Sequence, residues 1–132
     1  MEIAFDQPSG NWVELTIDDQ SFILSGVPCD PLSELVDAIV NALAYGSGVA
    51  KMDAEGETFR FEFSTDRLIA TRVSHDDQMV DEPIPIRKLA RKFLRAFELL
   101  KPKADGVWSR GIPNLEPLRR LLGQKAGQDF PT

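Results

Sequence analysis

Cys29 and His75 are the only cysteine and the only histidine of the chain, and their types are those of a nucleophile and its base. A thiolate activated by an imidazole can attack a carbonyl carbon if the fold brings the two groups together. No motif surrounds either residue, so we expect Cys29 to pack as a small apolar side chain beside a helix start, and we expect no catalytic residue. A hydrolase or metal-dependent enzyme is the alternative, and it would require Cys29, His75 or Asp76.

A group of carboxylates follows the histidine, namely Asp76, Asp77, Asp81 and Glu82. Hard oxygen ligands suit magnesium or calcium, but this spacing matches no calcium-binding loop. A zinc site would need more ligands than one histidine and one cysteine. The preferred interpretation is a solvated acidic loop, so the sequence predicts neither a metal site nor a cofactor.

Charge is distributed unevenly along the chain. The net charge is −6 and the isoelectric point is about 4.7. Residues 1–84 carry 17 acids and 4 bases, a net of −13, whereas residues 85–132 carry 4 acids and 11 bases, a net of +7. An acidic chain is a poor partner for nucleic acid, whose binding depends on Lys and Arg. We expect the basic segment to lie mainly beside the acidic part of the same fold, where it lowers self-repulsion.

The bases of the second half gather on one face of a predicted helix, at Arg87, Lys88, Arg91, Lys92 and Arg95. That face has the charge density to bind an anion or nucleic acid, which makes a nucleic-acid-binding regulator the second functional hypothesis. It has no aromatic side chain that could stack on bases. A solvated or internally paired face is therefore preferred, and nucleic acid is not the expected partner.

Trp108 and Arg110 lie in a predicted loop. Tryptophan and arginine are the residue types that most often anchor protein interfaces, and loops display such anchors. Large aromatic side chains are also usually mostly buried, so Trp108 could instead fold back and close the core beneath the last helix. Both interpretations stay open.

Three strands are predicted before the first helix. Residues 2–6 predict a short edge strand, which the turn formers of residues 7–11 end. Alternation of apolar and polar residues across 12–25 predicts a hairpin with one buried face. Asp30 and Pro31 then begin a helix, as a capping carboxylate followed by a proline at the first helical position.

That helix carries a continuous apolar stripe and ends at Gly46. Residues 49–74 predict three more strands, the clearest at 58–64, where phenylalanines alternate with polar residues as in a sheet covered on one side. Residues 75–85 are predicted to form a loop, because their two prolines exclude a central strand.

A second amphipathic helix is predicted for residues 86–100, with Pro102 as its stop. After a loop, Asn114 can cap a short helix that Gly123 ends. Residues 124–132 are predicted to be a flexible tail. The sequence therefore predicts a single α+β domain over residues 1–123, with the order β-β-β-α-β-β-β-α-α. Two main helices and the short C-terminal helix would cover one face of an antiparallel sheet.

Parts of the first half resemble a known group of proteins. The segments 12–17 (Trp-Val-Glu-Leu-Thr-Ile) and 29–36 (Cys-Asp-Pro-Leu-Ser-Glu-Leu-Val), with Gly46 and the Phe-Arg-Phe at 59–61, resemble small uncharacterised bacterial proteins, some of which look like immunity proteins of polymorphic toxin systems. The resemblance covers about half of the chain. It implies an acidic α+β cytoplasmic protein that binds and blocks another protein, and it offers no catalytic residues. The basic helix and the Trp108 loop fall outside it.

Taken together, these features favour a non-enzymatic protein-binding module of the immunity or inhibitor type. Its contact surface is expected on the polar sheet face that carries Glu14, Arg60 and Glu62, together with the acidic loop of residues 76–82, because acidic surface complements a basic partner. A half-exposed sheet could also be the surface of a homodimer. No segment is long and apolar enough to span a membrane and no secretory signal is recognised, so the expected location is the cytoplasm.

Overall fold

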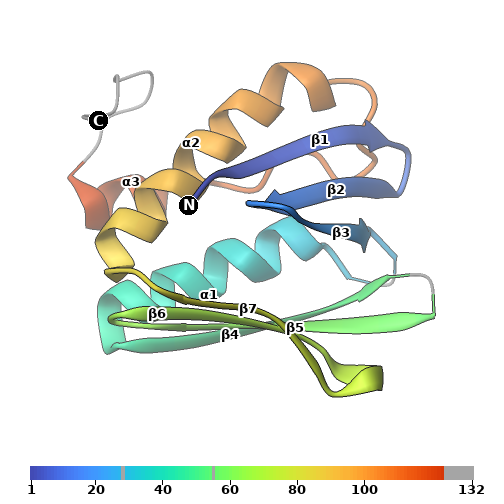
Figure 1. Cartoon of the computed structure of the whole chain (residues 1–132). Coiled ribbons are helices and arrows are strands. Elements are labelled where there is room, and N and C mark those ends of the chain that lie inside the picture. Colours follow the sequence, from blue (N-terminus) through green and yellow to red (C-terminus); the bar gives the residue numbers. More distant parts are fainter. Residues whose placement is uncertain (28, 55, 124–132) are drawn as a thin grey trace.

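The computed structural model describes residues 1–27, 29–54 and 56–123, and the α+β class predicted from the sequence is confirmed (Figure 1). The predicted flexible tail at 124–132 lies outside the described residues. The elements are β1 (Ile3–Ser9), β2 (Trp12–Ile17), β3 (Gln20–Ser25), α1 (Pro31–Tyr45), β4 (Ser47–Ala54), β5 (Glu57–Ser64), β6 (Arg67–Arg72), the 3-10 turn η1 (Val73–His75), β7 (Asp77–Pro83), α2 (Ile86–Ala104) and α3 (Glu116–Leu122).

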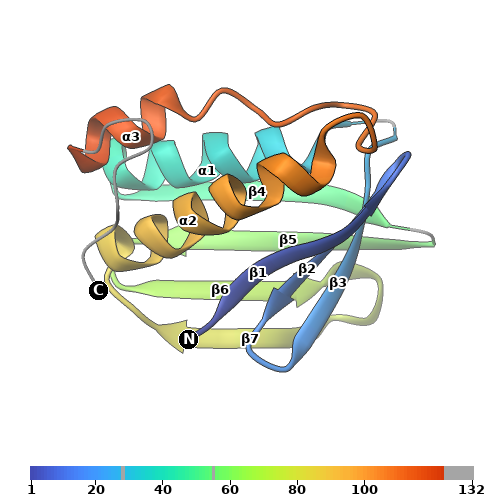
Figure 2. The same ribbon diagram turned by 90° about the horizontal axis from the view of Figure 1, so that it is seen from above.

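The strands divide between two antiparallel sheets instead of forming one layer. The smaller sheet has the order β1-β2-β3 and the larger has the order β4-β5-β6-β7. Figure 2 shows the smaller sheet running obliquely across the larger one, on the same side as α1 and α2. The apolar faces of the two sheets meet through Phe22, whose ring lies 5.1 Å from that of Phe59 and 5.0 Å from that of Phe61.

Both caps of α1 are confirmed. Asp30 Oδ1 accepts the N–H of Leu32 at 3.1 Å, and Gly46 ends the helix with φ 96° in the left-handed region. The chain then turns directly into β4, which packs against the helix. At Gly48 the approach is so close that a Cβ atom would lie 1.9 Å from the carbonyl oxygen of Ala38. Only glycine fits this contact between helix and strand.

The first strand is longer than predicted. Instead of ending at residue 6, β1 runs to Ser9 and pairs there with Trp12, after a shift in register that follows Asp6. Gln7 adopts a φ of 52° at this irregularity. A bulge absorbs residues that favour turns without ending the strand, because it leaves an extra residue out of the ladder.

The prediction of a loop for residues 75–85 is wrong over most of its length, since β7 occupies Asp77–Pro83. β7 is the edge strand of its sheet. Prolines exclude a central strand but are tolerated at an edge, where an N–H can be missing without breaking a ladder. Pro83 is accordingly the last residue of this edge strand.

The second helix also continues past its predicted stop, because Pro102 lies inside α2, which ends at Ala104. A proline so near the end removes one backbone hydrogen bond and leaves the rest of the helix intact. α3 is capped by Leu115 and not by the predicted Asn114, although Asn114 Oδ1 accepts the N–H of Glu116 at 3.1 Å; Gly123 ends the helix, as predicted, with φ 69°. None of the described helices combines the length and the apolar character that a membrane span requires.

Candidate functional site

The two sheets meet at a concave corner near the hairpin between β4 and β5. One hollow of about 340 Å³ lies between the outer side of β2 and β3 and the end of β5, and a second of about 360 Å³ continues along the hairpin. Ala54 and Glu57 line both hollows, so we treat them as one corner groove. Its lining residues are Trp12, Ser21, Ile23, Val27, Asp53, Ala54, Gly56, Glu57, Thr58, Phe59 and Ser74.

Apolar side chains lie open in this groove. Ile23 is 47% exposed and Val27 is 54% exposed, and Trp12 is half-buried. Ile23 occupies a position on the outer face of β3, between strand neighbours that point into the core. Exposed apolar side chains that gather in a concavity are typical of a binding surface, whereas isolated ones are not informative.

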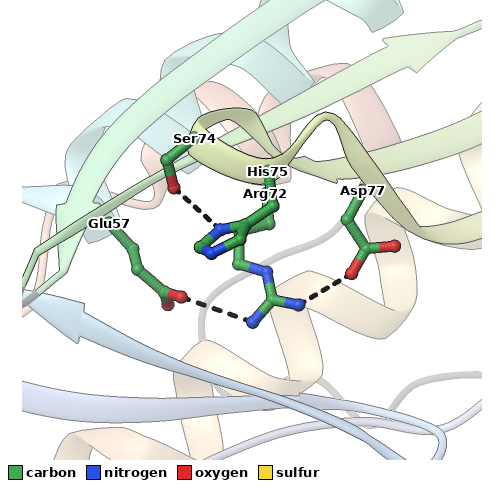
Figure 3. Close-up of polar contacts among 5 residues, drawn as sticks. All are labelled: Glu57, Arg72, Ser74, His75 and Asp77. Atoms are coloured by element: carbon green, nitrogen blue, oxygen red, sulfur yellow. Dashed lines mark hydrogen bonds and ion pairs between the residues drawn. The ribbon is translucent and has the colours of Figure 1, made fainter.

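An arginine joins two strands at the edge of the groove (Figure 3). Arg72 Nη1 donates to Glu57 Oε1 at 3.3 Å, and Nη2 donates to Asp77 Oδ2 at 2.8 Å. The hydrogen bond with Asp77 raises the pKa of Arg72 above its ordinary value, and Glu57 adds to that effect. Arg72 therefore stays cationic and fixes the positions of both carboxylates.

Carboxylates outnumber bases around the groove. Glu14 accepts a hydrogen bond of 2.6 Å from the hydroxyl of Ser21, on the wall formed by β2 and β3. Asp53 accepts one of 3.1 Å from Thr58 on the hairpin. With Glu57 and Asp77, these groups leave an excess of negative charge after Arg72 is counted. Next to them, His75 is exposed, and its Nδ1 lies 3.1 Å from the Oγ atom of Ser74.

The predicted polar contact surface is divided by the fold. Glu14, Asp76 and Asp77 lie at or beside the corner groove, but Arg60 and Glu62 lie on the outer face of the larger sheet, where they form an ion pair of 3.0 Å. The reason is that the inner faces of the two sheets meet, so their outer faces point in different directions.

The rest of the predicted acidic loop is also dispersed, because β7 alternates its side chains. Asp81 pairs with Arg67, away from the groove. Glu82 is half-buried and lies opposite Leu68 in the ladder. Asp76 occupies the left-handed region with φ 47°, at the end of η1.

Trp108 is a core residue and not an exposed interface anchor, since only 4% of its surface is exposed. A Cβ atom at Gly26 would lie 3.0 Å from its ring, and Arg110 Nε donates to the carbonyl of Gly26 at 2.8 Å. The N–H of Gly10 also bonds the carbonyl of Val107 at 2.9 Å. The Trp108 loop therefore closes the core, as in the second interpretation, but the contacts described here are with the ends of β1 and β3 and not with the last helix.

The bases of α2 are not paired with the acidic part of the fold in the way we expected. Arg87 donates to the carbonyls of Leu121 and Leu122, at 3.0 and 3.4 Å. Lys103 lies 3.5 Å from Asp6. Within the described residues, no ion pair or hydrogen bond involves the side chains of Lys88, Arg91, Lys92 and Arg95.

Cys29 is exposed, so the prediction that it packs as an apolar side chain is wrong. Over residues 1–27, 29–54 and 56–123, no group of three or more histidine, cysteine or acidic side chains is placed to hold a metal ion.

The sequence reasoning missed Trp12, Ile23 and Arg72. Ile23 could have been found from the sequence. It is a large apolar residue on the side of β3 that otherwise carries Ser21 and Ser25, and its partner on β2 is Glu14.

Comparison of the chain with protein-family models, with curated proteins and with solved structures gives no match. The resemblance to immunity-like proteins therefore stays a prediction.

Proposed function

We propose that this protein is a non-catalytic protein-binding module and that the corner groove binds a basic segment of a partner protein that carries an apolar side chain. The observation behind this proposal is that the exposed side chains of Ile23 and Val27 line the same concavity as the carboxylates of Asp53 and Glu57. An apolar side chain of the partner would cover Ile23 and Val27, while its basic residues would meet Glu14, Asp53 and Glu57.

Each of these features has a physical role in binding. Covering a largely exposed Ile or Val contributes about 1 kcal/mol through removal of apolar surface from water. The carboxylates attract a basic partner and disfavour an acidic one, so they act mainly on the association rate and on specificity. Arg72 holds Glu57 and Asp77 in place before binding, which lowers the cost of ordering them in the complex.

A narrower form of the proposal is an inhibitor of the immunity type that acts in a bacterial cytoplasm. The acidic groove would cover a basic functional surface of a toxin or nuclease and block it. This form is supported by the resemblance of residues 12–61 to immunity-like proteins and by the net charge of −6.

The test is affinity purification with two matched variants at about 0.15 M salt, where long-range electrostatics are screened beyond about 8 Å. Ile23→Arg places a large cation in the groove. Val49→Arg makes a similar change at a residue that is 55% exposed on the outer face of the larger sheet. A partner that the wild type and Val49→Arg recover, and that Ile23→Arg does not, agrees with the proposal. Recovery of the same proteins by all three chains, or of none by any, would refute it.

A further inference from the structure

A second surface lies on α2 and differs from the corner groove in charge and in place. We define the basic α2 face by Lys88, Arg91, Lys92 and Arg95. Leu89, Ala90, Phe93 and Phe97 fill the opposite side of the helix and are buried in the core. The helical repeat therefore places the four bases on the other side of the helix, where Lys88 and Arg95 are exposed and Arg91 and Lys92 are half-buried. At a rise of 1.5 Å per residue the row from Lys88 to Arg95 is about 10 Å long.

No carboxylate of the described residues forms an ion pair with the four bases of this face. Glu98 is the only acid within α2, and it is occupied by Arg119, whose Nε atom lies 3.0 Å from Glu98 Oε1. Arg87, at the start of the helix, is occupied by the carbonyls of α3. In Figure 2, α2 lies away from the end of the larger sheet that carries η1 and the β4–β5 hairpin, where the acids of the groove gather.

We propose that the basic α2 face binds the phosphate backbone of a double-stranded nucleic acid. Each strand of a duplex presents one phosphate per 3.4 Å of helix axis, so a row about 10 Å long spans the axial rise of about three successive phosphates. Such contacts position a protein on a duplex and carry no sequence information. Four unpaired cations on a rigid helix give a contact of this kind without any rearrangement of the fold.

Two other anionic partners fit the face less well. Single strands are bound through aromatic side chains on which bases stack, and the basic α2 face has none. A helix that lies in a membrane surface inserts an apolar face into the lipid. The apolar face of α2 is buried, and the one large apolar side chain that α2 exposes is Leu99, which is 57% exposed and follows the row of bases.

The experiment is fluorescence anisotropy of a labelled 20-base-pair DNA duplex of mixed sequence, titrated with the whole protein at several salt concentrations. With three to four phosphates neutralised, the logarithm of the association constant should fall with a slope of about −3 against the logarithm of salt concentration. This slope means a loss of about sixtyfold between 50 and 200 mM NaCl. Lys88→Gln should weaken binding by about tenfold at 50 mM salt and reduce the slope by about one.

Lys51→Gln is the matched control, because Lys51 is an exposed lysine on the outer face of the larger sheet and has no ion pair among the described residues. It makes the same change in net charge and should leave duplex binding unaltered. The absence of duplex binding at 50 mM salt, or an equal loss in both variants, would overturn the proposal. Tighter binding of a single strand of the same length would also overturn it, as would binding only to vesicles that contain phosphatidylserine.

Discussion

Among the described glycines, Gly48 leaves the least room for a side chain. The chain passes from α1 into β4 there, and an added methyl group would meet the backbone of Ala38 at 1.9 Å. Because the obstacle is backbone in the middle of a helix, it cannot rotate away as a side chain would. We expect Gly48→Ala to lower the free energy of unfolding by about 3 kcal/mol, as measured by urea denaturation. Ser47→Ala, at the exposed neighbouring position, is the control, and a Gly48→Ala protein as stable as that control would contradict the contact.

Asp6 gives a prediction about pH. Its carboxylate accepts the N–H of Gln7 at 3.0 Å, and this hydrogen bond, followed by the charge of Lys103, holds the pKa of Asp6 below its ordinary value of 3.8. Since the pKa is lower in the folded state than in the unfolded state, the ionised carboxylate stabilises the fold above about pH 3.8. That contribution is lost as the pH falls through the lowered folded value.

An NMR titration of the Asp6 carboxyl carbon measures this pKa directly. In Lys103→Gln it should move upward but stay below 3.8, because the Gln7 hydrogen bond remains. A titration midpoint at or above 3.8 in the wild type would show that neither contact persists in solution.

Residue-level prediction from the sequence succeeds where the cause is local. The caps at Asp30 and Gly46 are confirmed because a capping side chain and a left-handed glycine act within one turn of the helix. Cys29 and Trp108 depend on what the rest of the chain places beside them. Nothing near Cys29 in the sequence shows that it is exposed, and nothing near Trp108 shows that Gly26 leaves space for its ring.

Among the elements, the attachment of α3 depends on a contact that the sequence does not reveal. Arg87 donates to the last two carbonyls of α3 and so occupies acceptors that have no partner within that helix. We expect Arg87→Ala to speed amide hydrogen exchange in α3, with a local loss of about 1–2 kcal/mol. Hydrogen exchange read by mass spectrometry would show it, with Lys88→Ala as the control, and equal exchange in both variants would contradict this role.

The helices and most of the strands could be predicted from apolar periodicity, but the division into two sheets could not. Alternation in residues 12–25 and 58–64 shows that each strand has one buried face, and it says nothing about which strand pairs with which. Pairing is set by contacts between distant parts of the chain, such as those of Phe22 with Phe59 and Phe61. For the same reason Glu14 was grouped with Glu62, although the fold sends their side chains to different surfaces.

At the scale of the whole molecule, the two proposed surfaces are separate, and this separation is testable. The corner groove is built from the outer side of the smaller sheet and the β4–β5 hairpin, while the basic α2 face is built from a helix packed against β1. Binding at one should therefore leave the other free. We expect Ile23→Arg to bind the labelled duplex with a salt slope within experimental error of the wild type. A loss of duplex affinity as large as that of Lys88→Gln would show that the surfaces are coupled.

Net charge alone does not describe how charge is distributed over the surface of the molecule. A value of −6 predicts a poor partner for polyanions, and the segregation of charge along the sequence raised the expectation of internal pairing. The structure keeps the two signs apart, because the bases of α2 are bound to neither sheet except through Lys103 and Asp6. Local potential at a surface depends on which charges lie within a screening length and not on the sum over the chain.

The packing of β1 on α2 has a consequence for how the chain reaches its folded state. The ring of Phe5, in the first strand, stacks at 4.8 Å on that of Phe97, in the last long helix. During synthesis β1, β2 and β3 leave the ribosome before α2 has been made. The apolar side chains that pack against α2, such as Phe5, therefore stay exposed to water or to chaperones until then. Contacts between such distant parts of a sequence slow folding. The side of the smaller sheet that carries Phe5 should therefore become protected only in the same kinetic step as the docking of α2.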